Sequence, residues 1–210
     1  MLGTLVLTSC HRIDGSTRST AVAAVEHISM AIANLRLQET LRHQSLRDPL
    51  TGLFNRRYLE ASLERELSLA KRNHQPLAVL MLDIDHFKRF NDEHGHDGGD
   101  ALLTQFGAML AGMMRAEDVA CRYGGEEFTV LLQDANLALA LRRAEAICAA
   151  VRELKVSHQR QSLGSIRVSI GVACFPKQAG DVAELLRQAD RALYVAKRNG
   201  RDQVCVAQSA

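Results

Sequence analysis

The sequence predicts an α/β fold in which helices pack on a central β-sheet. Helical and extended patterns alternate along the chain, which is typical of domains built from layers of helix and sheet. Gly124-Gly125 lies between two short apolar runs, and paired glycines at such a place indicate a β-hairpin because tight hairpin turns need positive φ. The unbroken apolar run Leu77 to Leu82 suits a strand that is buried on both faces.

The first 47 residues are expected to lie outside this sheet. Residues 2–8 (LGTLVLT) have the composition of a β-strand, and a polar turn rich in Ser, Thr and Gly follows them. Residues 20–47 are predicted to form a helix, because apolar side chains recur there at three- and four-residue spacings. This apolar stripe consists of Val22, Val25, Ile28, Ile32 and Leu35. It either packs on the helix's own domain or pairs two copies as a parallel coiled-coil stalk, and we favour the stalk.

The elements that follow begin with a turn and a capped helix. Asp48-Pro49 is expected to end the first helix, since the residue before proline is disfavoured in the α conformation. Thr51-Gly52-Leu53 forms a turn, and Asn55 is a candidate N-cap for an amphipathic helix that runs to about Asn73. Gln75-Pro76 then leads into the buried strand.

The same patterns assign the rest of the chain. The expected helices cover residues 87–93, 100–114, 135–154 and 182–198, with a glycine-rich turn at 95–99 between the first two. The expected strands are 119–121 and 128–132, which flank the paired glycines, and later 166–175 and 203–206.

Charge balance and cysteine usage narrow the class of protein. The formal net charge of +2 over 210 residues gives no electrostatic case for binding nucleic acid. The five cysteines are scattered, with no CxxC pair and no zinc-ligand spacing, as expected for reduced thiols in the cytoplasm. No apolar segment reaches the roughly 20 residues that a membrane-spanning helix needs. We therefore expect a cytoplasmic protein without direct membrane insertion.

Three carboxylates are expected to meet near the hairpin. Asp83 follows the buried strand, and Glu126 and Glu127 follow the paired glycines. Asp83 and Glu126 together form an oxygen-rich pair of the kind that Mg²⁺ prefers, with substrate phosphates completing the coordination shell. Consecutive side chains of an extended segment point to opposite faces, so Glu126 and Glu127 are expected to have different roles. Taken alone, Gly-Gly-Glu-Glu also fits an ordinary charged turn.

Six sequence blocks resemble those of the GGDEF diguanylate cyclase family, in the variant with Glu at the third position of the signature. They occur in the family's order between about Ser45 and Ala207. The blocks are DPLTGLFNRR (48–57), LDIDHFKRFNDEHGHDGGD (82–100), RAED (115–118), RYGGEEF (122–128), SIGVA (169–173) and DRALYVAKRNGRD (190–202).

The resemblance implies a fold and a division into domains. The fold would be the ferredoxin-like palm shared with adenylyl cyclases and polymerases, preceded by the long N-terminal helix. Residues 1–19 would be the remnant of a sensor domain, because LGTLVLT is similar to the last strand of a GAF-type domain. Residues 20–47 would be the stalk, and residues 48–210 the GGDEF domain.

The resemblance also implies a reaction, the condensation of two GTP molecules into cyclic di-GMP with loss of pyrophosphate. Each domain would hold one GTP, so a homodimer joined by the N-terminal helix would be needed. Asp83, the Ile84 carbonyl and Glu126 match the family's ligands for Mg²⁺, with Mn²⁺ as the alternative metal. Glu126 or Glu127 would be the general base, and the sequence leaves both open.

Phosphate contacts are expected from two places. The first is the start of a helix, with Lys88 and the backbone N–H groups of His86 and Phe87. Lys88 is also expected to have a catalytic role. Lys197 and Arg201 are four residues apart and would share a helix face unless Gly200 ends the helix first. The alternative for this second pair is a solvated basic helix end.

Guanine recognition would use Asn91, His96 and Asp100. A carboxylate accepts hydrogen bonds from guanine N1–H and N2–H₂, and adenine offers no such pair, so Asp100 favours GTP over ATP. The alternatives are that Asn91 and Asp100 cap helices.

Arg115 and Asp118 fit the family's RxxD product-inhibition site, with Arg142 and Arg143 as possible secondary contacts. A local ion pair between Arg115 and Asp118 is the alternative. For the whole protein, the alternatives are a degenerate receptor that binds GTP or cyclic di-GMP without chemistry, and a structural dimerisation module. The complete set of metal-binding, phosphate-binding and base-reading residues favours the cyclase, because a receptor has no need of metal ligands.

Overall fold

The computed structural model describes residues 15–44, 46–159 and 161–208, and the chain divides into two units, residues 1–45 and 46–210. In the first unit, helix α1 spans Gly15–Gln44. The polar turn expected after the first strand is therefore wrong from residue 15 onward, where the chain is already helical. The helix also ends before Asp48-Pro49. The strand expected at residues 2–8 lies outside the described residues.

The apolar stripe of α1 is exposed to solvent in the single chain. Val22, Ile28, Ile32 and Leu35 are all exposed, as is Met30. Among the residues that the structure describes, no helix is both long enough and apolar enough to cross a bilayer.

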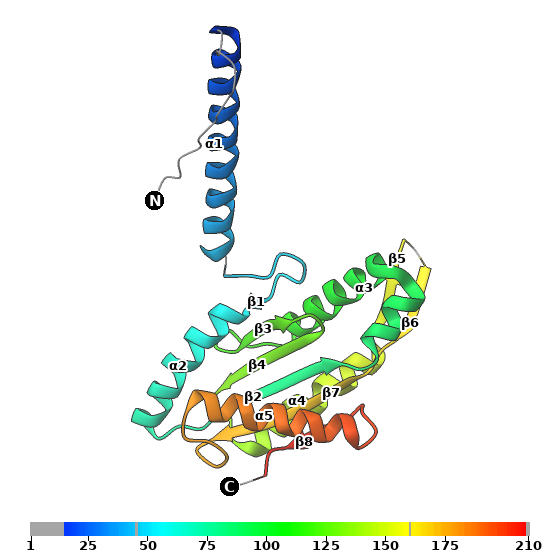
Figure 1. Ribbon diagram of the computed structural model, residues 1–210. Coiled ribbons are helices and arrows are strands. Elements are labelled where there is room, and N and C mark those ends of the chain that lie inside the picture. The colour runs from blue at the N-terminus through cyan, green and yellow to red at the C-terminus, as the bar shows by residue number, and fades with distance from the viewer. Residues whose placement is uncertain (1–14, 45, 160, 209–210) are drawn as a thin grey trace. The chain divides into compact units, whose positions relative to one another are not determined.

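The second unit is built on a six-stranded mixed sheet with the strand order β1-β3-β4-β2-β7-β8 (Figure 1). The strands are β1 (Phe54–Asn55), β2 (Leu77–Ile84), β3 (Val119–Gly124), β4 (Glu127–Gln133), β7 (Val168–Phe175) and β8 (Val204–Val206). The long strands β3, β4, β2 and β7 are antiparallel to one another in turn, and two βαβ connections link them. The short edge strands β1 and β8 pair in parallel with β3 and β7. This order is that of the ferredoxin-like fold, which confirms the predicted palm architecture.

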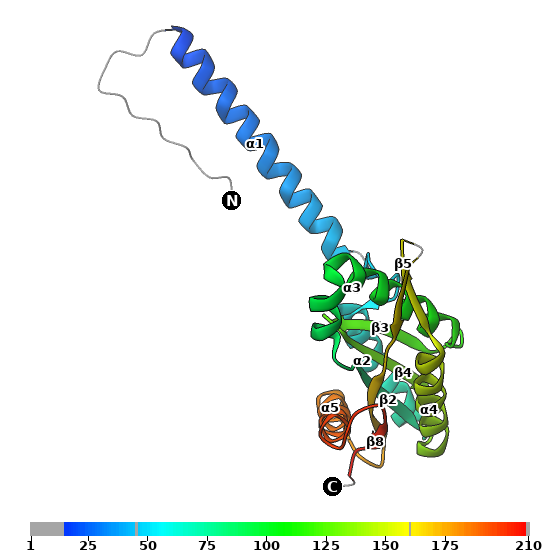
Figure 2. The same ribbon diagram turned by 90° about the vertical axis from the view of Figure 1, so that its right-hand side faces the viewer.

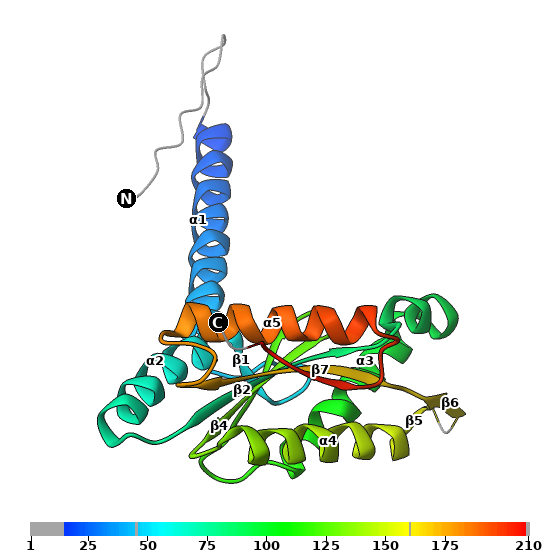
Figure 3. The same cartoon turned by 90° about the horizontal axis from the view of Figure 1, so that it is seen from below.

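The central strand β2 explains why the sheet is buried on both faces. All eight of its residues are buried, and its alternate side chains enter two separate cores. Leu80 and Leu82 belong to the core beneath α3 (Phe87–Gly112) and α4 (Leu137–Glu153). Val79 and Met81 belong to the core beneath α2 (Arg56–Asn73) and α5 (Val182–Arg198). Figures 2 and 3 show α4 and α5 on opposite faces of the sheet.

Two helix predictions have informative outcomes. Asn55 is the N-cap of α2, as predicted, because its side chain accepts a hydrogen bond from the Tyr58 N–H at 3.0 Å. The two helices expected at 87–93 and 100–114 are both present and run together as α3, with a kink between them that is shorter than the turn expected at 95–99. The break is confined to Gly95 (φ 74°, ψ 172°), where glycine alone adopts the conformation without strain.

The sequence patterns did not predict the hairpin of β5 (Lys155–His158) and β6 (Gln161–Ser165). Val156 is the one buried residue among the described positions of this hairpin, so no alternation of apolar and polar side chains marks it. The hairpin forms a separate two-stranded sheet beside the start of α3 (Figure 1).

Candidate active site

The paired glycines form the predicted hairpin turn. In the β3–β4 register Gly124 lies opposite Glu127, which leaves Gly125 and Glu126 as the two turn residues. Gly125 has a positive φ of 36°. Glu126 therefore belongs to the turn and only Glu127 belongs to the strand, so the expectation that the two acids alternate along one strand is wrong.

The three predicted carboxylates lie at one corner of the sheet. Asp83 is paired with Glu127 in the β2–β4 register, and directly opposite side chains leave the same face of a sheet. The turn is joined to the end of β2 by a hydrogen bond from the Ile84 N–H to the Glu126 carbonyl at 3.3 Å. Asp83 is only 5% exposed, and its Oδ2 lies 2.6 Å from Lys197 Nζ. Asp83 is thus paired with a lysine of α5, and among the described residues no side chain caps the start of α3.

This corner of the sheet favours a cation. Burial raises the pKa of Asp83 although Lys197 bonds to it, and the charge of Asp85 acts in the same direction. Burial, followed by the charge of Asp83, raises the pKa of Glu126. Negative charge is thus crowded there, and the Lys197 ammonium stands where a positive ion is most stable. The described residues contain no group of three His, Cys, Asp or Glu side chains that could hold a metal ion.

The phosphate-binding candidates lie at two helix ends. His86 precedes α3 in a left-handed conformation (φ 60°), and the helix begins at Phe87, with Lys88 exposed in its first turn. Lys197 lies in the last turn of α5, which ends at Arg198, so Arg201 does not share its helix face. Gly200 ends the helical path first, and Arg201 follows in a turn (φ 63°). The charge of Arg201 acts to lower the pKa of Asp83, against the larger effect of burial.

The guanine-reading candidates lie on α3. Asn91 Oδ1 is buried and has no hydrogen-bond partner within the described part of the chain. A Cβ at Gly99 would approach this oxygen to 1.8 Å, so the absence of a side chain at Gly99 leaves the space that Asn91 occupies. Asp100 and His96 are exposed nearby on the same helix. Asn91 and Asp100 both lie inside α3, so neither is a helix cap.

Asp118 of the RxxD motif is bound by a residue from another helix. Its Oδ2 accepts hydrogen bonds from the Arg115 backbone N–H at 3.0 Å and from Arg143 Nη2 at 2.8 Å. Arg143 also donates to the Met113 carbonyl at 2.8 Å. The ion pair of Asp118 is thus with Arg143, and the Arg115 side chain is exposed. A local ion pair within the motif is therefore not what the structure contains.

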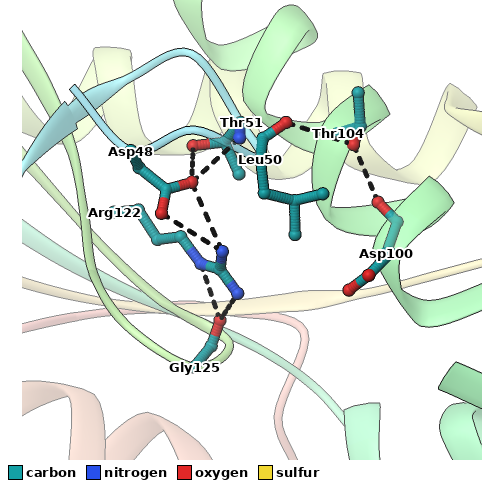
Figure 4. Close-up of polar contacts among 7 residues, drawn as sticks. All are labelled: Asp48, Leu50, Thr51, Asp100, Thr104, Arg122 and Gly125. Atoms are coloured by element: carbon teal, nitrogen blue, oxygen red, sulfur yellow. Dashed lines mark hydrogen bonds and ion pairs between the residues drawn. The ribbon is translucent and has the colours of Figure 1, made fainter. Parts of the chain in front are cut away.

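Sequence reasoning missed a set of contacts that holds the hairpin turn (Figure 4). Arg122 donates from Nε and Nη2 to the Gly125 carbonyl, at 3.0 and 2.9 Å, and from Nη1 to Asp48 Oδ1 at 3.3 Å. Asp48 also accepts from the backbone N–H and the hydroxyl of Thr51, at 2.8 and 2.7 Å. The turn that carries Glu126 is therefore tied to the loop that opens the second unit.

The same loop is also tied to α3. The Thr104 hydroxyl lies 3.3 Å from the Leu50 carbonyl and 2.8 Å from the Asp100 carbonyl (Figure 4). Asp48 and Leu50 both lie in the DPLTGLFNRR block, so the sequence comparison had marked this loop as part of the family pattern. The blocks did not reveal that Asp48 contacts Arg122, because these two residues are 74 positions apart in the sequence.

The fold and this corner of the sheet define a nucleotide cyclase-like palm domain. Residues 45–203 match the family described as diguanylate cyclase, GGDEF domain, and the chain belongs to this family. Response regulator PleD of Caulobacter vibrioides is 42% identical over 173 residues, which cover 80% of this chain and 38% of PleD. Diguanylate cyclase DosC of Escherichia coli is 38% identical over 179 residues, 84% of this chain and 39% of DosC. The chain thus spans about two fifths of the length of these relatives.

Solved structures are similar over the second unit. The GGDEF domain of TpbB from Pseudomonas aeruginosa has a TM-score of 0.74 at 38% identity and covers 77% of this chain and 94% of that one. The GGDEF domain of DgcB from Caulobacter crescentus, in complex with c-di-GMP, has a TM-score of 0.74 at 31% identity and covers 79% and 98%. An active GGEEF domain of a Vibrio cholerae diguanylate cyclase has a TM-score of 0.68 at 35% identity and covers 74% and 98%.

Proposed function

We propose that this chain condenses two GTP molecules into cyclic di-GMP and pyrophosphate, as a homodimer of GGDEF domains. The observation that carries the proposal is the convergence of Asp83, Glu126 and Glu127 with Lys197 at one corner of the sheet. Family membership supports the activity, and the active Vibrio domain with the same GGEEF signature supports chemistry with Glu at the third position.

Asp83, Glu126 and the Ile84 carbonyl would hold Mg²⁺, with Mn²⁺ as the alternative. The bound metal would supply positive charge to the phosphates and help ionise the attacking 3′-hydroxyl. Lys197, which is paired with Asp83 in the structure, would form an ion pair with the triphosphate. Lys88 and the first N–H groups of α3 would hold the remaining phosphate oxygens. Glu126 or Glu127 would take the proton of the hydroxyl.

Base selection would come from the buried acceptor Asn91 Oδ1 and the exposed carboxylate of Asp100, with His96 beside them. Guanine carries N1–H and N2–H₂ donors on one edge. A buried acceptor that lacks a partner disfavours any base that cannot donate to it.

Dimerisation and feedback complete the proposal. The exposed apolar stripe of α1 would pair two copies, since each domain holds one of the two GTP molecules. Cyclic di-GMP would bind at Arg115 and Asp118, with Arg143 already bonded to Asp118, and would inhibit synthesis. The complex of the DgcB domain with c-di-GMP supports product binding by this fold. We place the reaction in the cytoplasm, where GTP is supplied.

The test is incubation of the purified protein with GTP and Mg²⁺, with chromatography of the products. We expect cyclic di-GMP from the parent and none from a variant that combines Asp83→Ala with Glu126→Ala. Tight binding of GTP without product, even after fusion to a constitutive dimerisation domain, would overturn the cyclase in favour of a receptor.

A further inference from the structure

The turn that carries Arg201 has an unusual backbone. Gly200, Arg201 and Asp202 have consecutive positive φ angles of 106°, 63° and 47°. Glycine adopts this region freely, but a residue with a Cβ is destabilised in it. Two adjacent non-glycine residues in the left-handed region will not hold this shape unaided, so contacts from outside the turn must fix it.

The inner contact comes from Asp85, the first residue after β2. Asp85 is 8% exposed, and its Oδ2 accepts a hydrogen bond from the Asp202 N–H at 3.0 Å. Its Oδ1 accepts from the Ser169 hydroxyl at 2.8 Å, and its own N–H donates to the Arg167 carbonyl at 3.0 Å. One oxygen of this buried carboxylate thus holds the turn, and the other holds Asp85 itself against β7.

The outer contact comes from Arg152 on α4. Its Nε lies 2.9 and 3.0 Å from the two carboxylate oxygens of Asp202, and its Nη2 donates to the Asp202 carbonyl at 2.9 Å. Arg167 Nε adds an ion pair to the same carboxylate at 3.3 Å. The N–H, the carbonyl and the side chain of Asp202 are thus all bound, from three different elements.

We propose that the contacts of Asp202 with Asp85 and Arg152, here called the Asp202 clamp, are a positioning device for Arg201. The clamp fixes the residue next to Arg201, whose own N–H bonds to the Ala196 carbonyl at 3.0 Å. Asp202 bonds to Asp85, two residues from Asp83, so the clamp holds the backbone of Arg201 close to the end of β2 that carries the carboxylates. Less backbone freedom is then lost when the Arg201 guanidinium binds phosphate. The inference rests on the proposed function, because it needs a nucleoside triphosphate as the ligand.

The test measures binding of α,β-methylene-GTP with Mg²⁺ by titration calorimetry. Arg152→Met removes the outer contact at a side chain that is 43% exposed and far along the sequence from the metal ligands. Asp85→Ala removes the inner contact. Arg65→Met is the matched control, because Arg65 is also exposed, at 59%, and also forms an ion pair, with Glu66. We expect about tenfold weaker binding for each clamp variant, which corresponds to the loss of one charge-assisted hydrogen bond. The control should bind as the parent does.

A double-mutant cycle separates positioning from a general loss of stability. In an Arg201→Ala background, Arg152→Met should weaken binding no further, because the side chain that it positions is gone. An undiminished effect in that background would overturn the proposal, as would parent-like affinity of Arg152→Met. Thermal unfolding shows whether each variant is folded. If Asp85→Ala does not fold, the binding measurement with Arg152→Met alone tests the proposal. A parent protein that binds no GTP analogue would refute the proposed function, and the clamp with it, before any variant is compared.

Discussion

At the scale of single residues, Asp83, Glu126 and Glu127 place three acidic side chains at one corner of the sheet. Asp83 is buried, and within the described residues it forms an ion pair with Lys197, itself a candidate phosphate ligand. Repulsion among these carboxylates destabilises the folded protein without a ligand and favours binding of a cation. Features that improve cation binding here therefore lower the stability of the free protein.

Mg²⁺ should therefore stabilise the protein through Asp83. At a metal concentration ten times the Kd, binding adds about 1.4 kcal/mol, which raises the melting temperature by about 3–6 °C for a domain of this size. Asp83→Asn should abolish this increase, and the exposed-residue control Glu117→Gln should retain it. Thermal unfolding with and without Mg²⁺ measures both. An equal increase in Asp83→Asn would show that the metal binds elsewhere.

Asp48 should make stability depend on pH. Burial alone would raise the pKa of Asp48, but the hydrogen bonds from Thr51 and the charge of Arg122 outweigh burial and hold its pKa below the usual 3.8. A carboxyl group whose pKa is lower in the folded state contributes stability above its unfolded pKa, and that contribution is lost as pH falls through the folded pKa.

Urea unfolding measures this contribution. Asp48→Asn should lower the free energy of unfolding by about 1 kcal/mol at pH 7, for a half-buried ion pair that solvent partly screens. The difference should vanish in acid below the folded pKa, where the parent carboxyl is protonated too. Asp97→Asn, at an exposed position, is the control. A difference that persists unchanged in acid would mean that the side chain acts by packing and not by charge.

At the scale of elements, the kink of α3 brings two halves of one helix together. Gly99 lies against Asn91, and the space without a Cβ is what allows the Asn91 amide to sit where it does. The loop from Asp48 to Leu53 reaches two of the functional elements, since it bonds to Arg122 of β3 and to Thr104 of α3. Elements far apart in the sequence are thus connected by one short loop.

Gly99→Ala should separate substrate binding from folding. The added methyl group would displace the Asn91 side chain, which is flexible enough to move, so the helix should fold while the KM for GTP rises about tenfold, the cost of one lost buried hydrogen bond. Gly112→Ala is the matched control in the same helix, because nothing lies within 4 Å of its Cβ. That control should leave KM unchanged and add about 0.5 kcal/mol of stability. An unchanged KM in Gly99→Ala would remove Asn91 from base recognition.

At the scale of the whole molecule, the chain has two units of different character. The second unit buries one core on each face of its sheet, and the described part of the first unit is the helix α1, whose apolar stripe is mostly exposed. A helix with an exposed apolar stripe is stabilised by a partner with the same stripe. The proposed reaction needs two copies as well, so dimerisation and activity should be lost together.

Ile32→Glu should disrupt the proposed dimer by placing a charge in the stripe. We expect a monomer in sedimentation analysis and a loss of cyclic di-GMP synthesis of at least tenfold at micromolar protein. Met30→Glu is the matched control, since it adds the same charge to the same helix two residues away and off the stripe. Fusion to an unrelated parallel coiled coil should restore activity to Ile32→Glu. A monomeric parent with full activity would contradict the role of α1.

Regular elements with a periodic pattern were predictable. The central strand, the Gly-Gly hairpin and the helix capped by Asn55 depend on local spacing and turn chemistry, which a sequence displays directly. The hairpin of β5 and β6 was missed because its side chains are mostly exposed. The kink at Gly95 was predicted as a longer turn, because Gly95, Gly98 and Gly99 lie close together and the sequence does not show at which of them the helix is interrupted.

The sequence by itself determined the fold class, the family blocks and the chemical types of the site residues, because these depend on local pattern and side-chain chemistry. Only the tertiary structure decided the pairing of those residues. It placed Glu126 in the turn, joined Asp118 to Arg143, tied Arg122 to Asp48, and fixed Arg201 through Asp202 instead of through a helix face. Each of these contacts joins side chains from separate elements, and their distances are set by how the two cores pack against the sheet.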